Sequence, residues 1–331
     1  MTNGKTALIL GATGGIGGAI ARALIRHGWT VRGLARDPAT AQAGWRGGGA
    51  PAWIRGDAMD RADVITAARG VDAIVHAVNP PGYRDWERLV FPMMANTIAA
   101  ARAAGGPRVV LPGTIYNFDP ARVPVIDEQS PQAPRTRKGA IRVRLERMLE
   151  EAAPAVPSLV LRAGDFFGPG ARASWFAQAM VKPRRPVRAL SNPAKGPGHS
   201  WAYLPDLAET FARLMDAGER LHAFERVQFE GYCDATGSGM VDAVRRAVGR
   251  DVPSRPFPWW LMRLLAPLGG FPREVVEIEP YWSHPVRLDN RRLLALLGEE
   301  PRTPLDRAVE TTLAALGCFD RPALALSPRL A

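Results

Sequence analysis

The chain has 331 residues, of which 47% are apolar, and its formal net charge is +11. This length suits one large α/β domain or nearly two domains, and the composition excludes a disordered chain. Apolar runs are too short for a transmembrane helix, and the arginines lack the interleaved aromatics of a nucleic-acid footprint. The N-terminus does not resemble a signal peptide, and Cys233 and Cys318 have no metal-ligand spacing. We therefore expect a cytoplasmic protein with no membrane, nucleic-acid or metal partner.

The first 36 residues carry the strongest motif. Residues 6–10 are an apolar run of strand length, glycines follow at once, then residues 19–28 show helical spacing and 29–35 read as a second strand. Gly11 permits a tight exit from the strand, Gly14 lets a pyrophosphate approach the backbone, and Gly17 lets the helix pack on the sheet. Amides at the helix start would face the phosphates. The predicted cofactor-binding residues of this turn are Gly11, Thr13, Gly14, Gly15, Ile16 and Gly17.

The stretch "GATGGIG" (11–17) resembles the G-x-x-G-x-x-G loop of the short-chain dehydrogenase/reductase superfamily, in its extended and atypical branches with the NAD-dependent epimerase/dehydratase-like family. The resemblance implies an α/β fold, a Rossmann-type doubly wound parallel sheet of about seven strands. Arg36 and then Asp37 follow the second strand, with Arg32 nearby. A guanidinium matches a phosphate, which favours NADP(H). Asp37 as a ribose ligand would instead give NAD(H).

Two later strands bring further cofactor residues, as the resemblance implies. Relatives bind the adenine amino group with an Asp after the strand at 52–60, which makes Asp57 and Ala58 candidates; Asp57 as a helix cap is the alternative. A continuous apolar run predicts a buried strand from 71. The segment after it lines the cofactor in relatives and here comprises Ala77, Val78 and Asn79. His76, just before them, is expected to be a packed histidine.

The catalytic pair of the family is altered. Relatives carry Tyr-x-x-x-Lys, and alignment on Glu146 puts Lys138 and Arg142 at these places. Arg142 could hold the nicotinamide ribose but cannot shuttle a proton. Lys138, whose pKa we expect nearby arginines to lower, could replace the Tyr as the acid. Tyr116 could instead supply the phenol, beside Thr114, which matches the family residue that holds the substrate oxygen.

The second half predicts a smaller, mainly helical substrate domain. A strand from 157 leads into "RAGDFFGPG" (162–170), which resembles the segment where the extended branch enters that domain. Predicted helices cover 238–249, 257–268, 272–280, 290–297 and 304–315. We place the Rossmann domain at 1–165, with return segments near 200–230, and the substrate-binding domain at 166–331. Asp206 is expected to cap a helix of the return segment.

The predicted function is an NADP(H)-dependent oxidoreductase or epimerase-like enzyme acting on a carbonyl or alcohol of a small molecule, nucleotide sugars included. The alternative is an NADP(H)-binding sensor or scaffold without turnover, because the Tyr and the Lys are missing. The basic segment 181–195 weakly favours an anionic substrate. We expect the apolar stretch 257–271 to cover the substrate pocket. The resemblance also allows a homodimer, because relatives pair through a long helix like the one predicted at 85–104.

Overall fold

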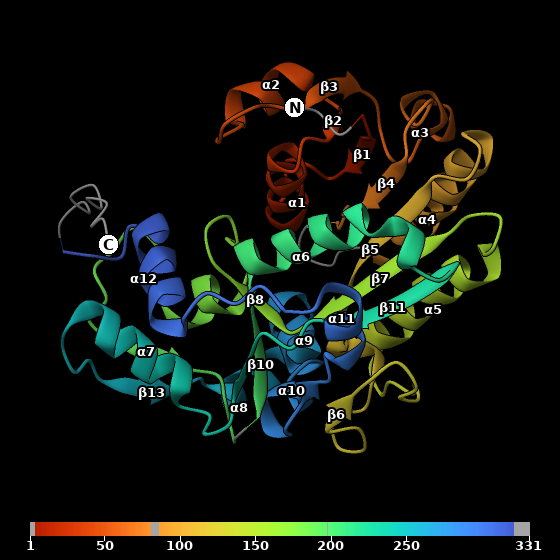
Figure 1. Cartoon of the computed structure of the whole chain (residues 1–331). Helices are drawn as coiled ribbons and strands as arrows, with labels where there is room; N and C mark the ends of the chain where they lie inside the picture. Colours follow the sequence, from red (N-terminus) through yellow and green to blue (C-terminus); the bar gives the residue numbers. More distant parts are fainter. Residues whose placement is uncertain (1–3, 81–85, 197, 321–331) are drawn as a thin grey trace.

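The computed structural model describes residues 4–80, 86–196 and 198–320 (Figure 1). Its centre is a seven-stranded sheet in the order β11-β7-β5-β4-β1-β2-β3, in which every neighbouring pair is parallel. The strands are β1 (Thr6–Leu10), β2 (Thr30–Ala35), β3 (Ala52–Arg55), β4 (Ala73–His76), β5 (Arg108–Thr114), β7 (Ser158–Ala163) and β11 (Phe224–Gln228). This confirms the predicted doubly wound parallel sheet.

Helices cover both faces of this sheet and create two cores. One face packs on α1 (Gly15–Arg26), α6 (Leu204–Asp216) and α11 (Arg291–Leu297), and the other on α3 (Arg61–Ala67), α4 (Trp86–Ala103) and α5 (Arg137–Ala152). Successive strand residues alternate between the cores: Ala7 and Ile9 face the first, Leu8 and Leu10 the second. Burial on both faces explains why the strands are almost continuously apolar. The short α2 (Pro38–Gly44) links β2 to β3.

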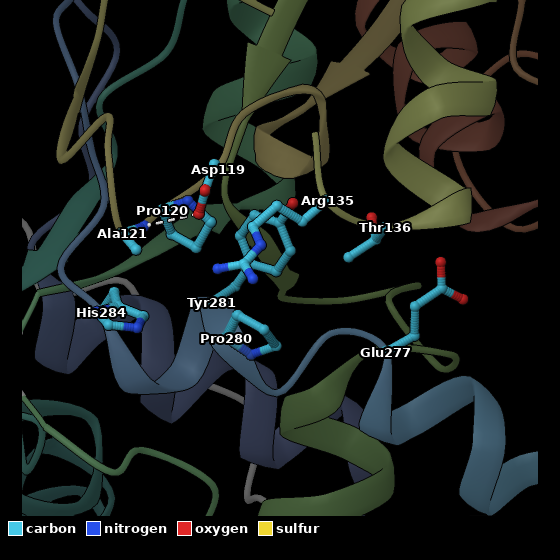
Figure 2. Close-up of a pocket in the computed structure, with 9 residues that line it drawn as sticks. All are labelled: Asp119, Pro120, Ala121, Arg135, Thr136, Glu277, Pro280, Tyr281 and His284. Atoms are coloured by element: carbon cyan, nitrogen blue, oxygen red, sulfur yellow. Dashed lines mark hydrogen bonds between the residues drawn. The ribbon is translucent and has the colours of Figure 1, made fainter. Parts of the chain in front are cut away.

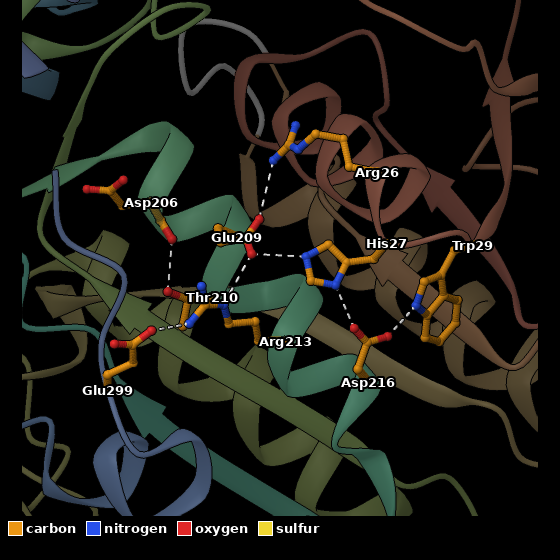
Figure 3. Close-up of polar contacts among 9 residues, drawn as sticks. All are labelled: Arg26, His27, Trp29, Asp206, Glu209, Thr210, Arg213, Asp216 and Glu299. Atoms are coloured by element: carbon orange, nitrogen blue, oxygen red, sulfur yellow. Dashed lines mark hydrogen bonds and ion pairs between the residues drawn. The ribbon is translucent and has the colours of Figure 1, made fainter. Parts of the chain in front are cut away.

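A polar network fastens the end of α1 to α6 (Figure 3). His27 Nδ1 lies 2.6 Å from Asp216 Oδ2, and its Nε2 lies 3.0 Å from Glu209 Oε1. The Trp29 indole donates to the other Asp216 oxygen at 2.7 Å. Burial lowers the pKa of His27, but the hydrogen bonds to Asp216 and Glu209 outweigh it, so the pKa is raised above 6.5. The imidazolium form therefore stabilises the contact between the two helices.

Beyond residue 164 the chain alternates between this sheet and a smaller unit. Three short sheets belong to the latter: β12 (Tyr232–Asp234), β10 (His199–Tyr203) and β8 (Asp165–Phe167); β13 (Ser254–Pro256) and β9 (Leu190–Asn192); β14 (Arg287–Leu288) and β6 (Val125–Ile126). The helices of the smaller unit are η3 (Phe176–Met180), α7 (Gly239–Val248), α8 (Trp259–Leu265), η5 (Ala266–Leu268), α9 (Gly270–Val276), α10 (Pro280–Ser283) and α12 (Leu305–Leu316). Two further short turns, η2 (Ile115–Asn117) after β5 and η4 (Gly218–Arg220) after α6, belong to the main sheet. The predicted helices all occur, except that 272–280 is divided between α9 and α10.

The apolar stretch 257–271 has one buried and one exposed side. Trp259 is buried against Trp175 and Phe257, and its indole donates to Pro193 O at 2.9 Å. Large apolar side chains on the exposed side are Trp260, Leu264, Leu268 and Phe271.

Among the described helices, none is long and apolar enough to cross a membrane. Within the described ranges, no three His, Cys, Asp or Glu side chains are grouped to hold a metal ion.

The structure overturns the helix cap expected at Asp206 and the alternative reading of Asp57 as a helix cap. Asp57 does not cap α3, because Asp60 does so by accepting hydrogen bonds from the amides of Ala62 and Asp63. Asp206 lies inside the first turn of α6, after the N-cap Tyr203. Its carboxylate accepts hydrogen bonds from the amide and hydroxyl of Thr303, at 2.6 and 2.7 Å, and so joins α6 to the segment before α12. Burial raises the pKa of Asp206 despite these bonds.

Candidate functional site

The glycine turn lies where the strand order of the sheet reverses. β1 and β4 are neighbours, and the chain leaves them toward opposite halves of the sheet, which is where such sheets bind ligands. Gly11 has φ +91°, and a Cβ there would lie 2.6 Å from Ala77 O, just after β4. A Cβ on Gly17 would lie 2.3 Å from Gly11 O. Side chains at either position would force the turn apart, so the backbone itself requires these glycines.

The start of α1 fits a pyrophosphate. Its N-cap is Gly14, so no capping side chain competes for the first amides, and its first turn has no acidic residue. Thr13 and Gly14 are exposed, whereas Ile16 packs against the core. A Cβ on Gly15 would lie 2.8 Å from Gly170 O, so the segment after β8 approaches the turn closely. The backbone at this turn therefore forms a cradle whose amides suit a phosphate group.

Asp37 is engaged as a helix cap. Its Oδ1 accepts hydrogen bonds from the amides of Ala39 and Thr40, and its Oδ2 accepts one from the Thr40 hydroxyl at 2.6 Å. The hydrogen bonds from Thr40 hold the pKa of Asp37 below its usual value. The neighbouring Arg36 is exposed. The competing reading, Asp37 as a ribose ligand, would require this carboxylate to leave its cap.

Sequence reasoning missed a second arginine beside Arg36. Arg55 ends β3 and pairs in register with Ala35, and its guanidinium donates to Arg36 O at 3.3 Å. The two arginines thus lie at the carboxyl ends of adjacent strands, β2 and β3. The sequence signal for this second arginine is a basic residue at the end of the strand that pairs with β2. Arg32, which we expected near the nucleotide phosphate, instead donates to two main-chain oxygens at the end of α3, those of residues 67 and 69.

The segments after β3 and β4 contact each other through α4. Asp57 Oδ1 accepts from Met59 N at 2.9 Å, and Asn96 of α4 donates to Ala58 O and Met59 O at 3.0 Å. Ala58 and Val78 both pack against the second core. Asn79 Oδ1 accepts from the Trp86 indole at 2.7 Å. These bonds fix the loops that the resemblance assigns to the cofactor.

His76 is a packed, neutral residue, as predicted. It is 3% exposed, and its Nδ1 lies 2.8 Å from Thr97 Oγ1. The Thr97 hydroxyl donates to Met93 O, so its oxygen accepts the proton on Nδ1. Burial and the charge of Arg142 lower the pKa of His76 to about 3. Arg142 itself lies with its guanidinium 5.0 Å from the centre of the Trp86 ring.

Lys138 lies at the start of α5 in a buried ion pair. Its side chain is 3% exposed, and Nζ lies 2.9 Å from Glu274 Oε2 and 3.6 Å from Glu277 Oε2. Nζ also donates to Glu274 O at 2.6 Å, and the Lys138 amide donates to Glu277 Oε1. Both carboxylates come from the α9 segment, far along the chain. They supply the negative charge that our argument from neighbouring arginines had not included.

Tyr116 and Thr114 stand at the carboxyl end of β5. Thr114 Oγ1 accepts from Tyr116 N at 3.4 Å and so caps the turn η2. The Tyr116 hydroxyl donates to Asp165 Oδ1 at 3.3 Å, and its ring lies 5.0 Å from that of Tyr281. The structure thus brings a phenol, a carboxylate and a threonine hydroxyl to one edge of the sheet. Asp165 lies in the stretch 162–170, which the sequence singled out only as the entry into the substrate domain.

Glu146, on which the catalytic pair was aligned, forms an ion pair with Arg162, the first residue of the stretch 162–170. Arg162 is 1% exposed, and its Nε lies 3.2 Å from Glu146 Oε1. Glu146 also accepts hydrogen bonds from Asn117 and Gln132 at 2.8 and 3.0 Å. This buried pair joins α5 to β7 and to the loop after β5. It holds the segments that carry Tyr116 and Lys138.

A hollow of about 380 Å³ opens beside this region (Figure 2). Tyr281 forms part of its wall and donates to Tyr116 O and Phe118 O, both at 2.9 Å. Burial raises the pKa of Tyr281, so this phenol stays protonated. The hollow is lined by Asp119, Pro120, Ala121, Arg135, Thr136, Glu277, Pro280, Tyr281 and His284. It therefore lies between the loop after β5, the start of α5 and the α9–α10 segment.

The sheet order and the glycine turn define an extended short-chain dehydrogenase/reductase fold. Residues 7–227 match the model of the NAD dependent epimerase/dehydratase family, and the chain belongs to this family. UDP-glucose 4-epimerase from Bifidobacterium longum, solved with NAD+ and UDP, is 14% identical with a TM-score of 0.71, covering 93% of this chain and 97% of that one. The UDP-Glc/GlcNAc 4-epimerase of Campylobacter jejuni is 15% identical with a TM-score of 0.71, covering 94% and 99%.

Another relative has a higher sequence identity than these two structures but aligns over a shorter region. A 3-diazoavenalumate denitrifying reductase from a Streptomyces species is 32% identical over 180 residues. The match covers 49% of this chain and 57% of that protein. This chain therefore spans little more than half of that relative's length.

Proposed function

We propose that the protein is an NADP(H)-dependent oxidoreductase of its family. The observation that carries this proposal is the bare glycine turn at the reversal of the strand order, where the amides of α1 suit a pyrophosphate. Arg36 and Arg55 would bind the 2′-phosphate of the adenosine, since guanidinium groups suit phosphate geometry. Asp37 is occupied by its helix, which supports NADP(H) over NAD(H). Asp57 and Ala58 would border the adenine, and residues 77–79 the nicotinamide side.

When bound, such a cofactor supplies a hydride at nicotinamide C4. Thr114 would hold the substrate oxygen, and Tyr116 would give or take its proton, because its hydroxyl faces the carboxyl ends of β5 and β7. Arg142 would hold the nicotinamide ribose. Lys138 would be structural, because carboxylates and a carbonyl surround its ammonium group. Of the alternatives left by the sequence, Tyr116 is thus the better-placed proton donor.

In this proposal, the substrate unit comprises residues from 166 onward, apart from the return segments near 200–230.

Two classes of substrate follow from the similar proteins. The structural neighbours are named for UDP-sugars, which suits a carbonyl or carbinol centre. The Streptomyces relative is named for a diazo compound and for reduction with loss of nitrogen. Reduction at such a centre would not need a phenol to protonate an oxygen, which fits the missing Tyr-x-x-x-Lys.

Turnover with NADPH tests the proposal. We expect oxidation of NADPH in the presence of a carbonyl compound, a UDP-sugar or 3-diazoavenalumate, with NADH less effective. Tyr116→Phe should slow carbonyl reduction by about 100-fold or more, and leave reduction of a diazo substrate nearly unchanged. Tight NADPH binding with no turnover on any of these substrates would instead support a sensor. That alternative is motivated by Lys138 and Arg142, which stand where relatives carry the Tyr and the Lys.

A further inference from the structure

The hollow in Figure 2 lies beside the proposed proton donor. Tyr281 lines the hollow, and its hydroxyl donates to Tyr116 O at 2.9 Å. The rings of the two tyrosines lie 5.0 Å apart. From the start of α5, Thr136 lines the hollow two residues before Lys138. A molecule bound in the hollow would therefore lie next to the segment that carries Thr114 and Tyr116.

The size and the walls of the hollow suit a compact organic molecule. Its volume of about 380 Å³ falls at the lower end of the range of small-molecule pockets, about 300–1,000 Å³. Pro120 and Pro280 provide a wall without polar side-chain atoms. The Tyr281 hydroxyl already donates to two carbonyl oxygens, so its ring is the part left for a ligand. Such walls favour an aromatic or conjugated body.

Two carboxylates line the hollow, and the protein already bonds both of them. Asp119 Oδ1 accepts a hydrogen bond from Ala121 N at 3.1 Å, and its Oδ2 lies 3.7 Å from Arg122 Nε. Glu277 Oε1 accepts a hydrogen bond from Lys138 N at 2.6 Å, and its Oε2 lies 3.6 Å from Lys138 Nζ. These contacts partly neutralise the two charges, but the carboxylates would still repel a ligand with several negative charges.

Two basic side chains line the same hollow with their donors unused. In the part of the chain that the structure describes, no group bonds the Arg135 guanidinium or the His284 ring. Figure 2 shows the guanidinium turned away from Thr136, toward the side of the hollow where Asp119 and His284 lie. A guanidinium binds a carboxylate through two parallel hydrogen bonds, and an imidazole adds a further N–H donor. The hollow therefore offers donors for one anionic group beside an apolar wall.

We propose that this hollow binds the carboxylate of a small aromatic or conjugated acid, and that this acid is the substrate of the reaction proposed above, on which this second statement rests. Arg135 would take the carboxylate through two hydrogen bonds and His284 through a third, while the conjugated body lies on the two prolines. A monoanion matches the single guanidinium charge. The diphosphate of a nucleotide sugar carries more negative charge, which the two carboxylates of the hollow would repel.

Calorimetry with trans-cinnamate, without any cofactor, tests the hollow itself. We expect cinnamate to bind, and both the uncharged trans-cinnamamide and the Arg135→Gln variant to show binding at least about 10-fold weaker, because each lacks one partner of a charged hydrogen bond. Arg137→Gln is the matched control, which should bind cinnamate normally. Arg137 is a neighbouring arginine that lies 3.7 Å from Glu87 and does not line the hollow.

Three results would overturn the carboxylate site, whatever the affinity for NADPH. These are absence of cinnamate binding, equal binding of the acid and the amide, and unchanged cinnamate binding in Arg135→Gln. Displacement of cinnamate by UDP would assign the hollow to a nucleotide diphosphate and would refute the choice of a carboxylate.

Turnover tests whether the bound acid is the substrate. With NADPH, Arg135→Gln should raise KM for para-carboxybenzaldehyde about 10-fold and leave kcat nearly unchanged, because the carboxylate is bound equally before and during hydride transfer. The KM for uncharged benzaldehyde should stay at its wild-type value. Equal changes with both aldehydes, or a loss of kcat alone, would refute the substrate role and leave the proposed function standing. A wild type that reduces neither aldehyde would refute both the carbonyl reduction and the substrate role, and calorimetry would still decide the carboxylate site.

Discussion

Lys138→Met distinguishes a structural lysine from a catalytic one. Met replaces the apolar stem of the lysine but removes the ammonium charge that Glu274 and Glu277 neutralise. Removing one partner of a fully buried ion pair costs about 3–5 kcal/mol. Here the carboxylates are 21% and 22% exposed, and Arg273 lies 3.8 Å from Glu274, so part of the loss is screened. We therefore expect a decrease of about 2–3 kcal/mol in the free energy of unfolding.

Urea unfolding and turnover, measured on the same preparation, test this expectation. Hydride transfer in folded Lys138→Met should stay within about 3-fold of wild type, since loss of a general acid costs about 100-fold or more. Lys195→Met is a matched control, because Lys195 pairs with Glu279 at 2.7 Å but is 38% exposed. It should cost no more than about 1 kcal/mol. A Lys138→Met protein of normal stability and normal NADPH affinity, but with turnover reduced about 100-fold, would show that Lys138 is the acid.

Three further changes test other contacts. Gly17→Val should abolish binding of NADPH in calorimetry, because its Cβ would lie 2.3 Å from the turn, whereas Gly44→Ala, with open space around its Cβ position, should bind normally. Glu146→Gln should lower the free energy of unfolding by about 3–5 kcal/mol, because it leaves the Arg162 charge buried; a loss below about 1 kcal/mol in urea unfolding would contradict this. The raised pKa of His27 means that its stabilisation is complete below about pH 6.5 and is lost as pH rises through the folded-state pKa. His27→Gln should therefore shift the urea midpoint more at about pH 6 than at about pH 9, and equal shifts would refute this sign.

The sequence was informative wherever neighbouring residues decide the structure. The turn at 11–17 could be predicted because the strand, glycines and helix are adjacent in the chain. Gly17 proves to be required by a contact within that unit, Gly11 by the segment after β4, and Gly15 by the segment after β8. The strands could be predicted because burial on both faces leaves a continuous apolar run. The helices of the second half were found from their periodicity, with errors at their ends and one predicted helix, 272–280, divided between α9 and α10.

The remaining features depend on contacts between distant segments. The partners of Lys138 come from α9, and those of Asp206 from Thr303, so neither carries a local signal. His199 was invisible for the same reason, since β10 places it beside Asp165 only in the folded sheet. Arg55 could have been found by asking which strand lies next to β2. The alternative of Asp57 as a helix cap was wrong because another Asp, three residues later, takes that role.

Calorimetric titration of the protein with NADPH, and separately with NADH, tests the central claim most directly. We expect NADPH to bind at least about 10-fold more tightly than NADH, a difference of about 1.4 kcal/mol that comes from the arginines at the ends of β2 and β3. Arg36→Ala should reduce this difference and leave the affinity for NADH unchanged. Equal affinities would contradict the assignment of the arginines. Absence of binding heat with both nucleotides would contradict the dinucleotide site at the glycine turn.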